Sequence, residues 1–104
     1  MPFIKIAGLP EKFLCDISED LIDIVNKETD TPKERIRIFY NPMKEIVEKS
    51  FVEDRIIIDI DWMPRPMEMR EKVSKAFFDY LENRGYKKIR IYFTDINKDY
   101  YFVK

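Results

Sequence analysis

The chain has 104 residues and a net charge of −1, with 19 basic side chains set against 20 acidic ones. This length favours one domain with a real core. The even mixture of charges provides no basic surface of the kind that nucleic acid requires, so nucleic-acid binding is disfavoured. The chain contains no histidine, which excludes imidazole-based catalytic triads and the usual zinc sites. We therefore expect no metal and no cofactor.

The sequence has no feature of a membrane or secreted protein. No stretch reaches the roughly 20 apolar residues that a membrane span needs, and the first residues lack the layout of a signal peptide. The single cysteine, Cys15, cannot form a disulfide within the chain. These features predict a cytoplasmic protein without membrane association.

The N-terminus reads MPFIKI, with Ile4 and Ile6 alternating with Lys5 as in a strand. If Met1 is removed, Pro2 becomes a free secondary amine at the start of that strand. A free α-amino group has a pKa of about 8, closer to neutrality than that of a lysine. Pro2 is thus either a candidate general base or a proline without a catalytic role.

Two later segments resemble each other, PKERIRIFYNPM at residues 32–43 and YKKIRIYFTDI at residues 86–96. Each is preceded by a helical stretch and, before that, by an apolar strand, at residues 3–8 in one copy and 55–62 in the other. The chain is therefore predicted to contain two β-α-β copies.

We divide the single domain into repeat one at residues 2–41, an insertion at residues 42–54 and repeat two at residues 55–104. The insertion is too long for a tight hairpin, so it is expected to form a projecting hairpin or a bridging strand. The tail at residues 100–104 is expected to add a short strand.

Apolar residues recur at the helical period in both copies. In the first helix they are followed by one glutamate on the same face, giving Leu14, Ile17, Leu21, Ile24, Val25 and Glu28. In the second helix they are Met69, Val73, Ala76, Phe77, Tyr80 and Leu81. Pro10 and Pro66 suit helix starts, and Gly85 suits a left-handed residue after the second helix.

The predicted order β-α-β-β-α-β defines an α/β (α+β) domain, and two folds accept it. One is a tandem repeat with pseudo-twofold symmetry, a four-stranded mixed sheet and two helices on one face. The other is the ferredoxin-like fold, in which the two β-α-β units interleave. The matching Ile-Arg-Ile strands favour the tandem repeat.

With its Met-Pro start, its duplicated β-α-β unit and RIRI after TDTP, the chain resembles the tautomerase superfamily. That superfamily includes 4-oxalocrotonate tautomerase and macrophage migration inhibitory factor (MIF). The resemblance covers nearly the whole chain and is greatest to an uncharacterised bacterial branch, which shares the tryptophan in the third strand and FTD near the end. It implies a MIF-like fold, a homotrimer and sites at subunit boundaries around the N-terminal proline.

The resemblance also implies roles for individual residues. Pro2 is the expected general base of a keto-enol tautomerase (an isomerase) acting on a small 2-keto acid. Arg37 matches an arginine that reaches a neighbouring site in the single-repeat members, and Arg90 is its counterpart in the second repeat. Arg90 and Tyr92 fall where longer members carry site residues on the fourth strand. Two family positions have no match, a loop arginine near Leu9 and a lysine near Thr31, so substrate recognition is expected to differ from the well-known members.

The chemistry of the residues agrees with these roles. An arginine fork can bind the carboxylate of a small anionic metabolite and stabilise an enolate. Arg65, before the second helix, is a further candidate for the carboxylate. Arg37 and Arg90 are otherwise outward charges on half-exposed strands, and Tyr92 is otherwise a packing or interface residue. Trp62 is expected in the core or in a pocket wall.

Two other functions stay open from the sequence. One is a non-catalytic trimer of the same fold that binds a small molecule or a partner, and the other is a ferredoxin-like ligand-binding module. Asp59 and Asp61 lie on one face of a strand, as in a metal site, but no other ligand converges on them. They are expected to be exposed or paired with basic side chains.

Overall fold

The structure is a computed structural model that describes residues 1–104. Its strands and α-helices are β1 (Phe3–Ala7), α1 (Glu11–Thr29), β2 (Arg37–Tyr40), β3 (Glu45–Val47), β4 (Ser50–Val52), β5 (Arg55–Trp62), α2 (Met67–Glu82) and β6 (Lys88–Asp95). Short 3-10 turns lie before β2 and after β6, at Lys33–Arg35 and Lys98–Tyr100. Neither helix combines the length and the apolar content that crossing a membrane requires.

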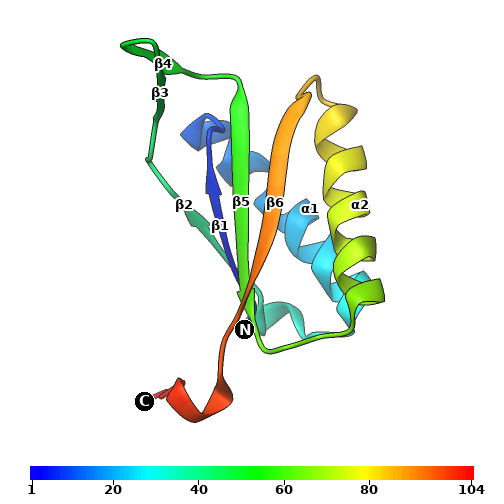
Figure 1. Cartoon of the computed structure of the whole chain (residues 1–104). Coiled ribbons are helices and arrows are strands. Elements are labelled where there is room, and N and C mark those ends of the chain that lie inside the picture. Colours follow the sequence, from blue (N-terminus) through cyan, green and yellow to red (C-terminus); the bar gives the residue numbers. More distant parts are fainter.

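Four strands form one mixed sheet in the order β2-β1-β5-β6, with both helices on one of its faces (Figure 1). β1 and β2 run parallel, β5 and β6 run parallel, and the two pairs meet antiparallel along β1 and β5. This arrangement confirms the tandem repeat with pseudo-twofold symmetry. The ferredoxin-like alternative is wrong, because β1 lies beside the second strand of its own repeat.

The two repeats have equivalent strand registers. Phe3 lies opposite Arg37 in the first repeat, and Ile57 lies opposite Arg90 in the second. The two Ile-Arg-Ile strands thus occupy matching places at the two edges of the sheet. By the same register, Pro2 corresponds to Ile56, which is fully buried in the core.

The core lies between the sheet and the two helices, as strand alternation and helical period predict. Ile4 and Ile6 of β1 and Phe77 of α2 belong to one hydrophobic core cluster, and all three are fully buried. One predicted position on α1 is wrong: Thr29 is buried at the end of the apolar face, where Glu28 was expected. The Thr29 hydroxyl donates to the Val25 carbonyl at 2.6 Å, so a small polar residue closes the helix without leaving a buried charge.

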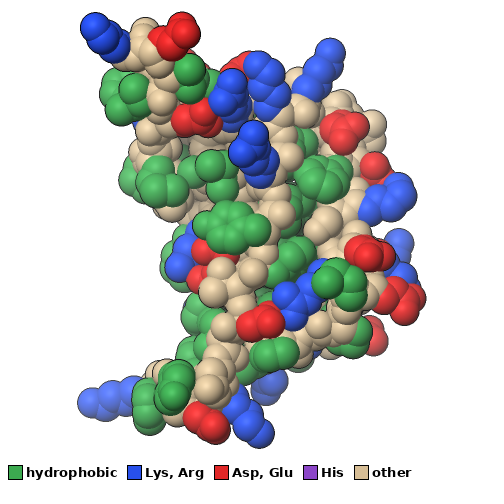
Figure 2. Space-filling model, in the orientation of Figure 1, with side chains coloured by type: hydrophobic (Ala, Val, Ile, Leu, Met, Phe, Trp, Pro, Cys, Tyr) green, Lys and Arg blue, Asp and Glu red, His purple; other side chains and the backbone are tan.

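The insertion forms the predicted projecting hairpin. β3 and β4 pair antiparallel and extend beyond the sheet (Figure 1). An ion pair of 2.7 Å between Glu45 and Arg55 ties the hairpin to the start of β5. Met43, Ile46 and Phe51 are exposed, and apolar side chains gather there on the visible face (Figure 2).

The predicted strand in the tail is wrong for the single chain. Lys98–Tyr100 form a 3-10 turn, and residues 101–104 have no regular structure. They run past the end of β6 (Figure 1), where the chain has no strand beside them to pair with. Phe102 is 88% exposed, so the tail shows an apolar surface rather than a strand.

Candidate active site

Pro2 lies at the start of β1 and is buried against the inner side of the sheet. Its carbonyl accepts a hydrogen bond of 3.0 Å from the backbone N–H of Arg37. Met1 precedes it, and the Met1 ammonium group donates to the carbonyl of Arg35 at 2.9 Å. The first residues are therefore fixed against the start of β2 and not free at the surface.

Burial lowers the pKa of the Met1 amine, and the positive charges of Arg37, Arg35 and Arg65 lower it further. None of these three arginines forms an ion pair with an acidic side chain. The N-terminus thus has an uncompensated positive environment, which favours a neutral amine and attracts an anion.

The topology explains how Arg65 reaches this place. β1 and β5 are antiparallel, with Phe3 opposite Asp61, so the end of β5 lies beside the start of β1. The turn that follows β5, residues 63–66, is therefore close to the chain terminus. The antiparallel pairing of β1 with β5 therefore brings Arg65 close to Pro2, although the two residues are far apart in the sequence.

Arg65 lies over a stacked aromatic pair. Its guanidinium carbon is 5.3 Å from the centroid of the Trp62 ring, and Trp62 stacks on Phe93 with centroids 4.8 Å apart. Trp62 is fully buried, as expected for a core or wall residue. The Nε atom of Arg65 is buried and has no hydrogen-bond partner.

Arg90 and Tyr92 are not grouped with Pro2 within one chain. Arg90 lies opposite Ile57, and Ile57 lies opposite Ala7 at the far end of β1. Tyr92 is half-exposed on the face of the sheet that the helices do not cover. It lies opposite Asp59, which in turn lies opposite Lys5 in the middle of β1. Both residues lie on β6, an outer strand of the sheet.

The uncovered face also carries a cluster of polar side chains around Asp59 and Asp61, which were expected to be exposed or paired with basic residues. Lys5 and Asp61 form an ion pair of 2.8 Å, so the expected pairing with a basic residue is confirmed for Asp61, although Asp61 is buried and not exposed. Burial raises the pKa of Asp59, and the neighbouring Asp61 carboxylate raises it further. Burial opposes ionisation of Asp61 as well, but the contact with Lys5 outweighs it and keeps its pKa low. Thr94 donates to Asp59 at 3.1 Å.

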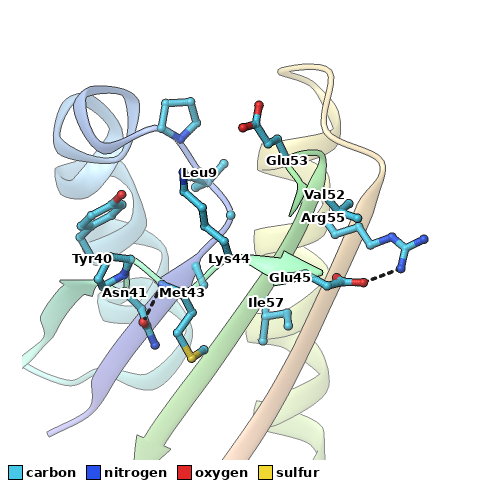
Figure 3. A pocket seen from close by; sticks show the side chains of 14 residues that line it. Leu9, Tyr40, Asn41, Met43, Lys44, Glu45, Val52, Glu53, Arg55 and Ile57 are labelled. Atoms are coloured by element: carbon cyan, nitrogen blue, oxygen red, sulfur yellow. Dashed lines mark hydrogen bonds and ion pairs between the residues drawn. The ribbon is translucent and has the colours of Figure 1, made fainter. Parts of the chain in front are cut away.

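Two cavities border these elements. One, of about 550 Å³, is lined by Met63, Pro64, Asp95 and Lys98 and lies beside the turn that carries Arg65. The other, of about 450 Å³, lies at the opposite end of the sheet under the hairpin, where Leu9, Lys44 and Ile57 are among its lining residues (Figure 3). Sequence patterns pointed to neither cavity, because both form between turns that are distant along the chain.

Comparison with known proteins places the chain in a family. The model of a domain of unknown function, DUF1904, matches residues 1–104. No protein of curated function matches the sequence.

Solved structures share the fold at low identity. A DUF1904 domain from Sebaldella termitidis has a TM-score of 0.91 at 19% identity, covering 99% of this chain and 95% of that chain. A MIF-like protein from Entamoeba histolytica has a TM-score of 0.78 at 16% identity, covering 99% and 95%. A fused 4-OT described as an asymmetric trimer has a TM-score of 0.77 at 12% identity, covering 97% and 91%. The chain therefore belongs to the DUF1904 family and has the fold of the tautomerase superfamily.

Proposed function

We propose that the chain, once Met1 is removed, is a proline-dependent tautomerase of small 2-keto acids. The observation that carries the proposal is the position of the Met1 amine beside Arg35, Arg37 and Arg65, three cations without acidic partners. Removal of Met1 would leave the Pro2 amine one residue away from that position. Such surroundings lower the pKa of an amine and hold a carboxylate at the same time.

The reaction is a 1,3-proton transfer. The neutral Pro2 amine removes a proton from the carbon next to the carbonyl of the keto acid, and negative charge develops on the carbonyl oxygen. Arg37 stabilises that charge, and Arg65 binds the carboxylate. Return of the proton from the Pro2 ammonium group to the enolate oxygen gives the enol and restores the neutral base.

A homotrimer completes the proposed site. Arg90 and Tyr92 lie on the outer strand β6 and on the uncovered face, so they contribute to the site of a neighbouring chain. The exposed apolar residues of the hairpin and the tail supply further surface for that contact. Sedimentation should give a trimer, and a stable monomer with full activity contradicts this part of the proposal.

The direct test of the base is Pro2→Ala in untagged protein, with loss of Met1 checked by intact mass. Phenylpyruvate tautomerisation should fall by about a hundredfold or more, since positioned general bases contribute about 10²- to 10⁴-fold. Ile56→Val changes the equivalent position of the second repeat and is the matched control, with activity retained. Wild-type activity in processed Pro2→Ala sinks the proposal.

A second candidate function is a non-catalytic trimer that binds a small anion. It is favoured by the three unpaired arginines, which bind an anion whether or not a base is present. This candidate requires no working base, so it is compatible with an N-terminal amine of ordinary pKa in the processed chain. Titrating the rate of amine modification against pH tests the first candidate, because an ordinary pKa excludes the tautomerase and leaves the anion-binding trimer. Where the pKa is lowered, the phenylpyruvate assay decides between the two.

A further inference from the structure

Arg70, in the first turn of α2, is used by no step of the proposed reaction, yet its side chain joins three elements. Its Nε atom donates to the carbonyl of Arg65 at 3.1 Å, and its Nη2 atom lies 2.7 Å from Oδ1 of Asp95 at the end of β6. The guanidinium group also packs 5.9 Å from the ring centroid of Trp62 and 5.7 Å from that of Phe93. The side chain is only 16% exposed.

These contacts differ in kind from those of Arg65. Arg70 has an acidic partner, a backbone acceptor and two aromatic neighbours, so its position is fixed by both charge and packing. Arg65 has only the face of Trp62 and a buried Nε without an acceptor. Arg70 thus has an ion-pair partner and a hydrogen-bond acceptor, whereas the charge of Arg65 has neither and is available for a ligand.

The turn that carries Arg65 depends on this neighbour. Residues 63–66 contain two prolines, Pro64 and Pro66, which have no backbone N–H to donate. The carbonyl of Arg65 receives its hydrogen bond from the Arg70 side chain instead of from a helix or a strand. Losing that contact frees the turn to move relative to Trp62.

We propose that Arg70 and Asp95 are positioning residues that hold Arg65 over Trp62, where Arg65 binds the carboxylate of a small 2-keto acid. The inference deepens the proposed function and rests on it for the identity of the ligand. Two parts of the inference do not depend on Pro2: an anion binds at Arg65, and Arg70 and Asp95 set the affinity for that anion.

Trp62 provides the readout. It is the only tryptophan of the chain, and it lies directly under Arg65. Neutralising the guanidinium charge with a bound carboxylate changes the field at the indole ring, so titration with pyruvate should change its fluorescence. Pyruvate is used as the probe because, unlike phenylpyruvate, it has no aromatic ring to absorb the exciting light.

The test compares Arg65→Gln, Arg70→Lys and Asp95→Asn with the control Arg84→Gln, which removes an arginine that packs on Tyr80 beyond the end of α2. Arg65→Gln should weaken pyruvate binding by about tenfold or more, the effect of one charge-assisted hydrogen bond. Arg70→Lys keeps the charge but loses the fork, and it should weaken binding by about three- to tenfold, as should Asp95→Asn. With phenylpyruvate, both should raise KM and leave kcat within about twofold.

Two results overturn the inference. One is wild-type binding in Arg65→Gln. The other is wild-type binding in Arg70→Lys and Asp95→Asn while Arg65→Gln is impaired, because Arg65 then needs no support. If Asp95→Asn does not fold, Arg70→Lys decides alone, with its melting temperature as the check. Failure of the Pro2 test removes the proposed base but leaves this binding pattern intact, so the two failures are distinguishable.

Discussion

The two ends of the sheet are related by the pseudo-twofold of the repeats but carry different chemistry. At the N-terminal end, Pro2 begins a first strand, Arg37 lies on the second strand, and Arg65 lies in the adjoining turn. At the hairpin end, Ile56 and Arg90 take the places of Pro2 and Arg37. A duplicated backbone can thus offer two similar frames, but only the one at the chain terminus can provide a free amine.

The adjoining turns also differ in how much space they leave. At the hairpin end, Gly8 has a φ of 98°, and a Cβ atom there would lie 2.0 Å from the carbonyl oxygen of Arg55. At the N-terminal end the turn is longer, with three residues between Trp62 and Pro66, and it accommodates the Arg65 side chain. The turn at Gly8 is thus fixed against the start of β5 on one side, while its other side lines the cavity under the hairpin.

The largest expected effect concerns the packed turn. Gly8→Ala combines an unfavourable positive φ with a backbone clash, so it should lower the free energy of unfolding by about 2–5 kcal/mol. Urea denaturation measures this difference. Gly85→Ala is the matched control, because Gly85 also has a positive φ of 93° but open space around its Cβ position, and its cost should be only about 1–2 kcal/mol. Equal costs in the two variants contradict the close approach at Gly8.

The next effect tests which chain supplies each arginine. Arg37→Gln and Arg90→Gln should each lower kcat/KM by about ten- to a hundredfold. In the proposed cyclic trimer, Arg90 serves the site of the neighbouring chain. Refolding equal amounts of Pro2→Ala and Arg90→Gln chains together should then restore about a quarter of the sites.

The control mixture pairs Pro2→Ala with Arg37→Gln. Arg37 lies beside the N-terminus of its own chain, so no hybrid site contains both wild-type residues and no activity should return. If activity returns in this control mixture, Arg37 serves the site of a neighbouring chain. If no activity returns in the first mixture, Arg90 does not serve the site of a neighbouring chain. Native mass spectrometry establishes that mixed trimers have formed.

The smallest expected effect is on pH dependence. Burial and then the three arginines lower the pKa of the Met1 amine, and the same surroundings should act in the same direction on the Pro2 amine once Met1 is removed. The kcat/KM value should therefore rise with pH and level off above the lowered pKa, as the amine loses its proton. Arg37→Gln removes one cation and should move the midpoint upward by less than about one pH unit. Arg84→Gln should leave it unchanged. A downward shift of the midpoint in Arg37→Gln would contradict the prediction that the Arg37 charge lowers the pKa of the amine.

Much of the fold could be predicted because the pattern was local and repeated. Ile36 to Ile38 and Ile89 to Ile91 identified the second strands, and the helical period identified α2 from Val73 to Leu81. The grouping of Arg65 with Pro2 was harder to predict, because it depends on the antiparallel junction of β1 and β5. The contacts of Arg70 with Arg65 and Asp95 leave no sequence pattern at all. The predicted strand in the tail was wrong because Tyr101 and Phe102 have strand-forming side chains but no neighbouring strand to pair with.

The outer strands of the sheet have a consequence for handling the protein. β2 and the eight-residue β6 each have one side without a paired strand, and such edges readily bind other extended chains. In the proposed trimer, a neighbouring subunit that covers these edges would protect the fold from aggregation as well as complete a site. Variants that weaken assembly should precipitate during expression or concentration, so their yield of soluble protein will reveal the loss of a neighbour earlier than their melting temperature does.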